Sequence, residues 1–333
     1  MINLFKKSIA LFLLANLNSC GAEKVVYDIA SKCNGLTIEN VKYQNSLTDD
    51  CRSAIMNLLD GYSTNLEKRL YTLGSESNDT SFNLYISGVK VDGSAVKISD
   101  FSGLSVSLIN SDNTYTDLSK DLIAVSELDP TKTLAAFEFV SDYSGSMREA
   151  DITMVNTIFS NLLECLPKKT EGEIIEFSNA VQIRQAFTDN INDLKSGFTL
   201  NKNLKRDSTA LYDAIGLSAE HLKAKSKPIK ILFVATDGLE NSSIKYKSID
   251  TVKAAIKESK GVPILLGSLF ADAANLSDIA GTQGAFIYAK SLDLISSKAA
   301  RICAIASPVS INIKGKYPSE QKFRVQAAGL LTK

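Results

Sequence analysis

The 333-residue sequence contains no tryptophan and only one histidine, His221. This scarcity argues against a histidine-based metal site and against a catalytic triad, since both depend on imidazole chemistry. Basic and acidic side chains are balanced at 37 each, so the formal net charge is zero. A neutral chain gives no electrostatic reason to expect a nucleic-acid partner. His221 falls in the polar-faced helical stretch 217–224, where we expect it to be a surface residue.

The N-terminal region lacks an apolar run long enough to cross a bilayer as a permanent helix. A short apolar stretch, Ile9–Ala15, follows two basic residues, Lys6 and Lys7. This order is typical of an export signal rather than of a membrane-spanning helix. We therefore expect the protein to leave the cytoplasm and to reside in the cell envelope.

The segment 17–21, with the sequence LNSCG, resembles a bacterial lipobox. The resemblance implies that residues 1–19 are a lipoprotein signal peptide and that Cys20 becomes the lipidated first residue, anchoring the protein to a membrane. Gly21 stands where some bacteria place the aspartate that signals inner-membrane retention, so the outer membrane is favoured. The alternative is an ordinary signal peptide that is cleaved nearby.

No C-x-x-C pair occurs among the five cysteines, which argues against a zinc or thioredoxin-like site. Setting Cys20 aside leaves an even number, and an even number of cysteines in an exported protein suggests disulfides. The remaining residues are Cys33, Cys51, Cys165 and Cys303. They allow three pairings. We favour Cys33–Cys51 and Cys165–Cys303, because each pair then lies within one region of the chain.

The most informative segment is 137–147, with the sequence FEFVSDYSGSM, where an apolar strand pattern changes into a helical one. It places one carboxylate and two hydroxyls, those of Asp142, Ser144 and Ser146, at alternate positions. Oxygen ligands of this kind suit a hard divalent cation such as Mg²⁺. These three groups supply only part of its coordination shell, so we expect further ligands elsewhere in the chain.

Two further oxygen ligands stand at the ends of predicted elements. Thr209 begins a helical pattern, and Asp237 follows the apolar strand pattern 229–236. In open α/β sheets, ligands bind at the carboxyl ends of the strands. We therefore expect Thr209 and Asp237 to lie near Asp142 at one edge of a parallel sheet.

Three motifs together resemble the von Willebrand factor type A (vWA) family: D-x-S-G-S-M at 142–147, S-T-A-L-Y-D-A-I at 208–215 and T-D-G at 236–238. Between residues 131 and 306, strand and helix patterns alternate, which predicts a mostly parallel sheet. The resemblance implies the Rossmann-like α/β fold of a vWA domain over 131–306, with helices on both faces of the sheet.

The resemblance also implies a metal-ion-dependent adhesion site made by Asp142, Ser144, Ser146, Thr209 and Asp237. The two serines would contact the cation directly, Thr209 directly or through water, and the two aspartates would hold bound waters. Mg²⁺ is the expected ion, and Mn²⁺ and Ca²⁺ are alternatives because they share oxygen sites. An open position on the metal would accept an Asp or Glu carboxylate from a partner protein.

The rest of the chain falls into three segments around this domain. Residues 20–80 read as a linker and a helical segment, since apolar residues recur at helical spacing. Residues 81–130 hold short apolar or alternating runs separated by turn residues, which predicts a small β-rich accessory domain. We expect strands in 307–333 to return and pair with it, so that the vWA domain is an insertion within a β domain.

Glu138 departs from the pattern of a central parallel strand, which is normally apolar on both faces. A buried carboxylate needs a partner or a proton. We therefore expect Glu138 to face the strand edge or to meet a lysine or arginine.

In some vWA proteins the last helix slides when ligand binds. The resemblance implies that a Cys165–Cys303 disulfide, which would join that helix to the first helix of the domain, restrains this slide. The affinity of the site would then be fixed rather than switched. The alternative is that the bond only adds stability.

These features favour an exported, lipid-anchored binding protein that captures a protein partner through a metal-bridged carboxylate, as in adhesion. A structural or assembly component of an envelope or secretion complex is the alternative, because it would use the same chemistry. An enzyme is disfavoured, since no histidine is placed to activate Ser144 or Ser208 and a G-x-S-x-G motif is absent. Metal-assisted hydrolysis is a remote alternative, and we expect no small-molecule substrate.

Overall fold

The computed structural model describes most of the chain from residue 69 onward. The described residues are 69–90, 94–101, 103–202, 207–237, 239–267, 271–281, 283–288, 299–318, 321–327 and 330–332. The predicted signal peptide, Cys20 and the Cys33–Cys51 pair lie outside these ranges and stay predictions. Among the described helices, none is both long and apolar enough to span a membrane.

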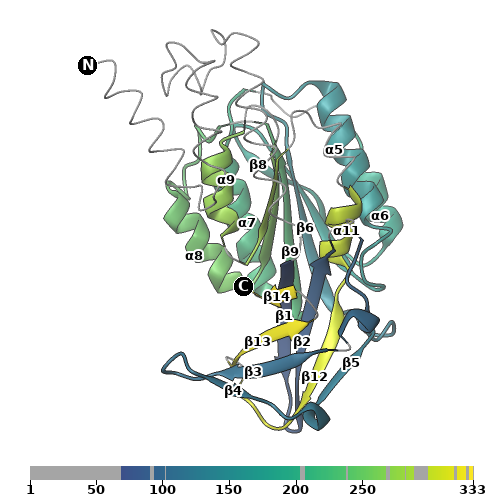
Figure 1. The fold of residues 1–333 in the computed structure, drawn as a ribbon. Helices are drawn as coiled ribbons and strands as arrows, with labels where there is room; N and C mark the ends of the chain where they lie inside the picture. Colours follow the sequence, from purple (N-terminus) through teal and green to yellow (C-terminus); the bar gives the residue numbers. More distant parts are fainter. Residues whose placement is uncertain are drawn as a thin grey trace, which may run out of the picture.

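An α/β sheet occupies the upper part of the molecule as drawn in Figure 1. Its strands are β6 (Ala135–Asp142), β7 (Glu171–Phe177), β8 (Val181–Thr188), β9 (Ile229–Thr236), β10 (Val262–Gly267) and β11 (Ala285–Tyr288). They lie side by side in the order β8-β7-β6-β9-β10-β11, and all neighbours are parallel except the β7–β8 hairpin. Every residue of β6, β9 and β10 is buried, as expected for central parallel strands covered on both faces.

Helices cover both faces of this sheet (Figure 1). The described helices are α5 (Glu149–Leu162), α6 (Ile191–Gly197), α7 (Leu211–Ala224), α8 (Ile249–Ser259), α9 (Ala273–Ala280) and α11 (Ala299–Ala306). On one face, α5 packs Phe159 against the stacked rings of Phe139 and Phe233. On the other, α7 to α9 share a second core with Val140 and Val234. The α/β prediction with helices on both faces is confirmed.

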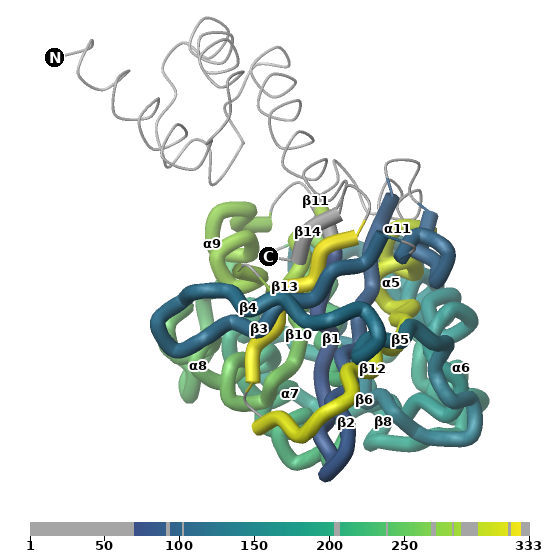
Figure 2. The backbone as a smooth tube through the Cα atoms, turned by 60° about the horizontal axis from the view of Figure 1, so that its bottom comes forward, coloured from purple at the N-terminus to yellow at the C-terminus, as the bar shows by residue number. Residues whose placement is uncertain are grey.

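A β-rich region adjoins the α/β part. It contains β1 (Arg69–Ser77), β2 (Ser81–Val89), β3 (Ser105–Ile109), β4 (Tyr115–Asp117), β5 (Ile123–Ser126), β12 (Val309–Lys314), β13 (Lys322–Ala327) and β14 (Leu330–Thr332), with short 3₁₀ turns at Ile98–Phe101 and Lys120–Leu122. The C-terminal β12 pairs with β2 and β5, and β13 pairs with β3. Figure 2 shows that the strands before the α/β part, β1 to β5, and the strands after it, β12 to β14, lie together.

Strand β1 corrects one expected segment. We expected a linker and helical segment up to residue 80, but residues 69–77 already form strand β1. Leu70 packs into the core of the β-rich region, whereas Tyr71 and Leu73 pack into the core beneath α5. A strand presents alternate side chains to two faces, so it buries both sets. This gain comes from distant residues and overrides local helical spacing.

Strand β1 also joins the two parts into one continuous sheet. It pairs with β2 along most of its length and meets β9 at the single bridge Gly74↔Ile229. The backbones approach so closely there that a Cβ on Gly74 would lie 1.7 Å from the Pro228 carbonyl oxygen. The accessory strands are therefore attached directly to the central strands that carry the candidate site.

Candidate metal centre

The predicted ligands stand at the carboxyl edge of the parallel sheet. Asp142 is the last residue of β6, and Asp237 directly follows β9. In register, Asp142 lies beside Phe177 at the end of β7, while Ser141 lies beside Ala235 of β9. Parallel pairing therefore brings these strand ends together, as the sequence motifs require.

Four of the five predicted ligands form one hydrogen-bonded cluster. The hydroxyl oxygens of Ser144 and Ser146 are 3.1 Å apart, and Ser146 Oγ donates to Asp237 Oδ1 at 2.8 Å. Asp142 Oδ1 accepts the Ser144 N–H at 2.7 Å. Its Oδ2 accepts the Thr236 hydroxyl at 2.5 Å. Asp142 and Asp237 are both buried. The cluster therefore holds its potential metal-ligand oxygens close together in a fixed arrangement.

Thr209 lies on the loop that leads into α7. The loop is attached to the end of β7, where the Ala210 N–H donates to the Ser178 carbonyl at 2.6 Å. The Thr209 N–H in turn donates to Asn241 Oδ1 at 2.8 Å. Among the described residues, no hydrogen bond joins the Thr209 side chain to the other four predicted ligands. Its role as a ligand, like that of the other four, stays a prediction.

The electrostatics of the cluster fit a divalent cation. Burial, and next the negative charge of Asp142, raise the pKa of Asp237 to about 7. The two carboxylates therefore destabilise each other in their charged forms. A dication between them would offset both the repulsion and the loss of hydration. Carboxylates and hydroxyls are hard oxygen donors, the kind that Mg²⁺, Mn²⁺ and Ca²⁺ accept.

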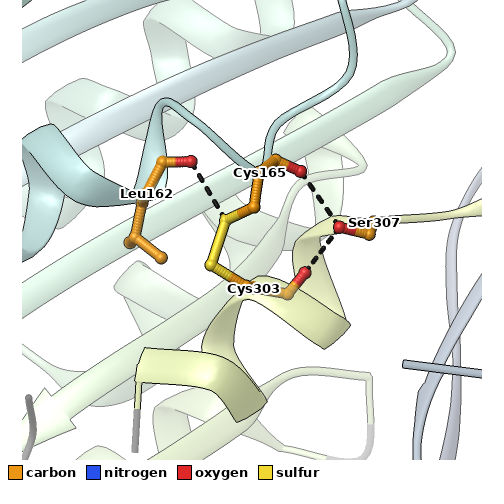
Figure 3. Close-up of a disulfide and its surroundings, with 4 residues drawn as sticks. All are labelled: Leu162, Cys165, Cys303 and Ser307. Atoms are coloured by element: carbon orange, nitrogen blue, oxygen red, sulfur yellow. Dashed lines mark hydrogen bonds between the residues drawn. A yellow bond between two sulfur atoms is a disulfide. The ribbon is translucent and has the colours of Figure 1, made fainter. Parts of the chain in front are cut away.

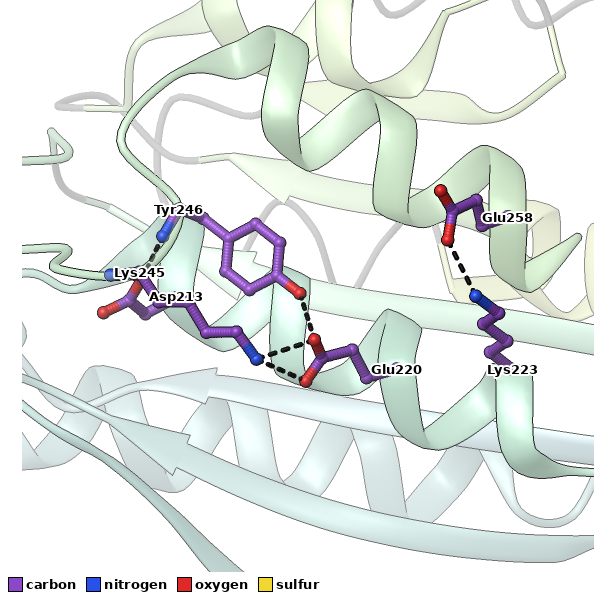
Figure 4. Close-up of polar contacts among 6 residues, drawn as sticks. All are labelled: Asp213, Glu220, Lys223, Lys245, Tyr246 and Glu258. Atoms are coloured by element: carbon purple, nitrogen blue, oxygen red, sulfur yellow. Dashed lines mark hydrogen bonds and ion pairs between the residues drawn. The ribbon is translucent and has the colours of Figure 1, made fainter.

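The loop after Asp237 holds α7 in place, and the sequence motifs did not reveal its role. Glu240 accepts the Tyr212 N–H at the start of α7, at 2.8 Å. Asp213 accepts the backbone N–H groups of residues 244–246 at 2.7–2.9 Å. Figure 4 shows the same loop bonded to Glu220 of α7 through a lysine and a tyrosine side chain.

Of the supporting residues, Thr236 and Asp213 stood within quoted motifs, whereas Glu240 and Asn241 did not. The contacts of Glu240, Asn241 and Asp213 join segments about 30 residues apart. No local pattern predicts such pairs, because they depend on how the loop folds back over the helix start.

The structure corrects the expected environments of Glu138 and His221. Glu138 is fully buried, and among the described residues it forms no ion pair with a lysine or arginine; instead, its Oε1 lies 4.0 Å from His221 Nδ1. His221 is not a plain surface residue, because its side chain is only 28% exposed and Nδ1 is hydrogen-bonded to Glu173. The reason is helix packing: α7 lies over β6 and β7 and turns this imidazole toward the sheet. Burial, followed by the charge of Glu173, raises the pKa of Glu138 well above its usual value.

A disulfide joins Cys165 to Cys303, which confirms the predicted pairing of these two residues. Cys165 lies in the turn just after α5 rather than within the helix, and Cys303 lies in α11. Their Cα atoms are 5.6 Å apart. Figure 3 shows the Ser307 hydroxyl between the carbonyl oxygens of both cysteines, at 3.0 and 2.7 Å. The end of α5 and the last described helix are therefore covalently attached.

Residues 138–298 match the family described as von Willebrand factor type A domain. The chain carries a vWA domain. The match begins inside β6 and includes every predicted metal ligand. No curated protein sequence matches the chain.

Solved structures resemble the chain at low sequence identity. One is proximal thread matrix protein 1 (PTMP1) from the mussel byssus, with a zinc-occupied MIDAS motif; it is 16% identical, with a TM-score of 0.47, over 55% of this chain and 48% of that one. The match thus spans about half of that protein. Another is the conserved hypothetical protein BatB from Bacteroides thetaiotaomicron, 15% identical with a TM-score of 0.40, over 50% of this chain and 98% of that one. A mutant of the PilB minor pilin from Streptococcus sanguinis is 14% identical with a TM-score of 0.41, over 71% and 76% of the two chains.

Proposed function

We propose that this protein is an exported, lipid-anchored binding protein that captures a protein partner through a divalent cation, with Mg²⁺ as the preferred ion. The observation that carries the proposal is the hydrogen-bonded cluster of Asp142, Ser144, Ser146 and Asp237 at the carboxyl edge of the sheet. When bound there, the cation would supply an electrophilic centre for an Asp or Glu carboxylate of the partner.

The chain's own residues orient the donors for this task. The Ser144 N–H and the Thr236 hydroxyl each donate to a different carboxylate oxygen of Asp142. Ser146 is held in turn by Asp237. Groups fixed in this way lose little conformational freedom when an ion binds, which favours tight binding.

We further propose binding rather than catalysis. His221 is the only histidine of the sequence, and it is hydrogen-bonded to Glu173 beneath α7 rather than beside the serines of the motif. Ser144 therefore has no imidazole to act as its general base. In the proposed site Asp142 and Asp237 bind the waters of the cation, so metal-assisted hydrolysis would lack a free general base as well.

The proposed envelope location rests on the basic, apolar and lipobox-like segments before Cys20. Adhesion and envelope assembly would use the same metal-bridged contact. The position of the partner distinguishes them, because an adhesive partner lies outside the cell and an assembly partner lies in the envelope.

The proposal is tested by isothermal titration of the chain with Mg²⁺ and Mn²⁺, and by capture of partners from envelope extracts and extracellular matrix. Wild-type protein should bind either ion and retain a partner with Mg²⁺ but not with EDTA. Asp142→Ala should lose both properties. Asp121→Ala, which removes an exposed carboxylate from the β-rich region, is the matched control and should behave as wild type. Capture that survives both EDTA and Asp142→Ala would overturn the metal bridge.

A further inference from the structure

A second group of potential metal ligands lies beneath helix α7, away from the proposed adhesion site. It consists of Glu138 on β6, Glu173 on β7 and His221 on α7. Each offers one ligand atom, and the three atoms lie within 4.8 Å of one another. Glu138 stands four positions before Asp142 on β6, which is about 13 Å along a strand. The two groups are therefore separate sites on the same strand.

The unusual member of this group is Glu138. Its side chain is completely buried, and neither of its carboxylate oxygens has a hydrogen-bond partner among the described residues. Glu173, also buried, takes up His221 Nδ1 as its own partner. One imidazole thus faces two carboxylates, and Glu138 is left aimed at it from 4.0 Å. Burying a carboxylate without partners costs free energy, so the arrangement favours a cation bound beside Glu138.

Lys225 does not supply this cation. Lys225 Nζ lies 3.3 Å from Glu171 Oε2, at the start of β7, and stacks 3.7 Å over the ring of Phe187. A dication bound among the three side chains would contact both carboxylates and the imidazole at once. The arrangement is thus a set of converging ligands rather than a simple ion pair.

We propose that Glu138, Glu173 and His221 form a second cation site, selective for a first-row transition dication such as Zn²⁺. One imidazole nitrogen with two carboxylate oxygens suits zinc, whereas Mg²⁺ prefers oxygen ligands alone. Tetrahedral ligands about 2 Å from zinc lie about 3.4 Å from one another. Glu138 Oε1 and His221 Nδ1 are at 4.0 Å. Small side-chain rotations, with the opening of the Glu173–His221 hydrogen bond, therefore bring the three atoms into range.

The exposure of His221 provides access to this site. Its side chain is 28% exposed, whereas those of Glu138 and Glu173 are 0% and 5% exposed. An ion can thus enter beside the imidazole and displace its hydrogen bond. Three protein ligands leave a fourth position for water, as in open zinc sites. This proposal does not depend on the proposed adhesive function.

The test uses His221 as its own reporter, because it is the only histidine in the sequence. The imidazole signals of the full-length protein are followed by NMR as Zn²⁺ is added, with free thiols alkylated and Mg²⁺ present in excess. The proposal predicts that the His221 signals move to a bound form that saturates with equimolar Zn²⁺, while Mg²⁺ alone leaves them unchanged. Asp142→Ala should give the same Zn²⁺ response, which separates this site from the adhesion site.

Glu138→Gln is the decisive variant. It keeps the size of the buried side chain and removes its charge, so it should fold, as circular dichroism would verify. Its Zn²⁺ affinity should fall by at least about tenfold. Glu258→Gln, on the exposed face of α8, should bind Zn²⁺ as wild type does. The proposal is overturned if excess Zn²⁺ leaves the His221 signals unchanged, or if Glu138→Gln binds as tightly as wild type; the cluster would then share protons instead of a metal ion.

Discussion

At the residue scale, the buried carboxylates differ in how many hydrogen-bond and ion-pair partners they have. Asp142 accepts a backbone N–H and a hydroxyl. Asp237 accepts the hydroxyl of Ser146. Glu176 has Asn201 Nδ2 at 2.6 Å and Arg184 Nε at 3.8 Å, whereas Glu138 has no hydrogen bond among the described residues. A carboxylate buried without full compensation destabilises the fold whenever it is charged.

Glu176 provides a pH-dependent test of this cost. Burial raises its pKa from the usual 4.5, although its hydrogen bonds and Arg184 act in the opposite direction. The folded state therefore holds the proton more tightly than the unfolded state, and stability falls as pH rises from 4.5 through the raised pKa. Glu176→Gln removes this loss and still accepts the Asn201 hydrogen bond. Urea unfolding should show little difference from wild type at pH 4 and a more stable variant at pH 8.

The matched control for this series is Glu258→Gln. Glu258 is exposed, and its hydrogen bond with Lys223 lowers its pKa. The contribution of Glu258 to stability has the opposite sign. A carboxyl whose pKa is lowered in the folded state stabilises the fold at pH values above its unfolded-state pKa, and this stabilisation is lost as pH falls. The control should therefore gain nothing at pH 8. A stability difference between Glu176→Gln and wild type that is the same at pH 4 and pH 8 would contradict the assignment.

At the element scale, the sequence predicted those helices and strands whose ends carry local signals. Helix α8 begins directly after Ser248, whose side chain caps it by accepting the Thr251 N–H. Helix α9 likewise begins directly after Asp272, whose side chain caps it by accepting the Asn275 N–H. Such signals are contained within one turn of chain. The motif around Asp142 was recognisable for the same reason, since its ligands are close in sequence.

Elements and contacts that depend on distant segments could not be predicted from the sequence. Strand β1 packs its two faces into two different cores, and neither core is visible from its own residues. His221 faces Glu173, 48 positions away, only because α7 crosses the sheet at a particular place. The same holds for Glu240 and the start of α7. Tertiary packing, rather than propensity, decides each of these cases.

The Cys165–Cys303 disulfide gives the prediction that belongs to this scale. It joins the turn after α5 to α11 across 138 positions of sequence. Replacing both cysteines with serine should lower the free energy of unfolding by about 2 to 5 kcal/mol, because the unfolded chain loses a long cross-linked loop. If the bond also restrains α11, limited proteolysis of the folded variant should cut near that helix faster than in wild type. Unchanged cleavage and unchanged affinity for a captured partner would mean that the bond only stabilises.

At the scale of the whole molecule, the β-rich region and the vWA domain share a sheet. The C-terminal strand β12 pairs with β2, which pairs with β1, and β1 meets β9 next to the central strand β6 (Figure 1). A force or displacement applied to the β-rich region therefore reaches the strands that carry Asp142 and Asp237 through paired backbone. The backbone pairing at this junction is narrow, because among the described residues β1 and β9 share one bridge, at Gly74.

Gly74→Ala tests whether this junction supports the fold. The added Cβ would lie 1.7 Å from the Pro228 carbonyl oxygen, which is backbone and cannot rotate away, so β1 and β9 must separate. We expect a loss of about 1 to 3 kcal/mol in the free energy of unfolding, with faster amide hydrogen exchange at the first residues of β9. Gly103→Ala is the control, since its Cβ would meet nothing within 4 Å, and it should change stability by less than about 0.5 kcal/mol. Equal stability and exchange in the two variants would show that the two parts of the sheet are held together elsewhere.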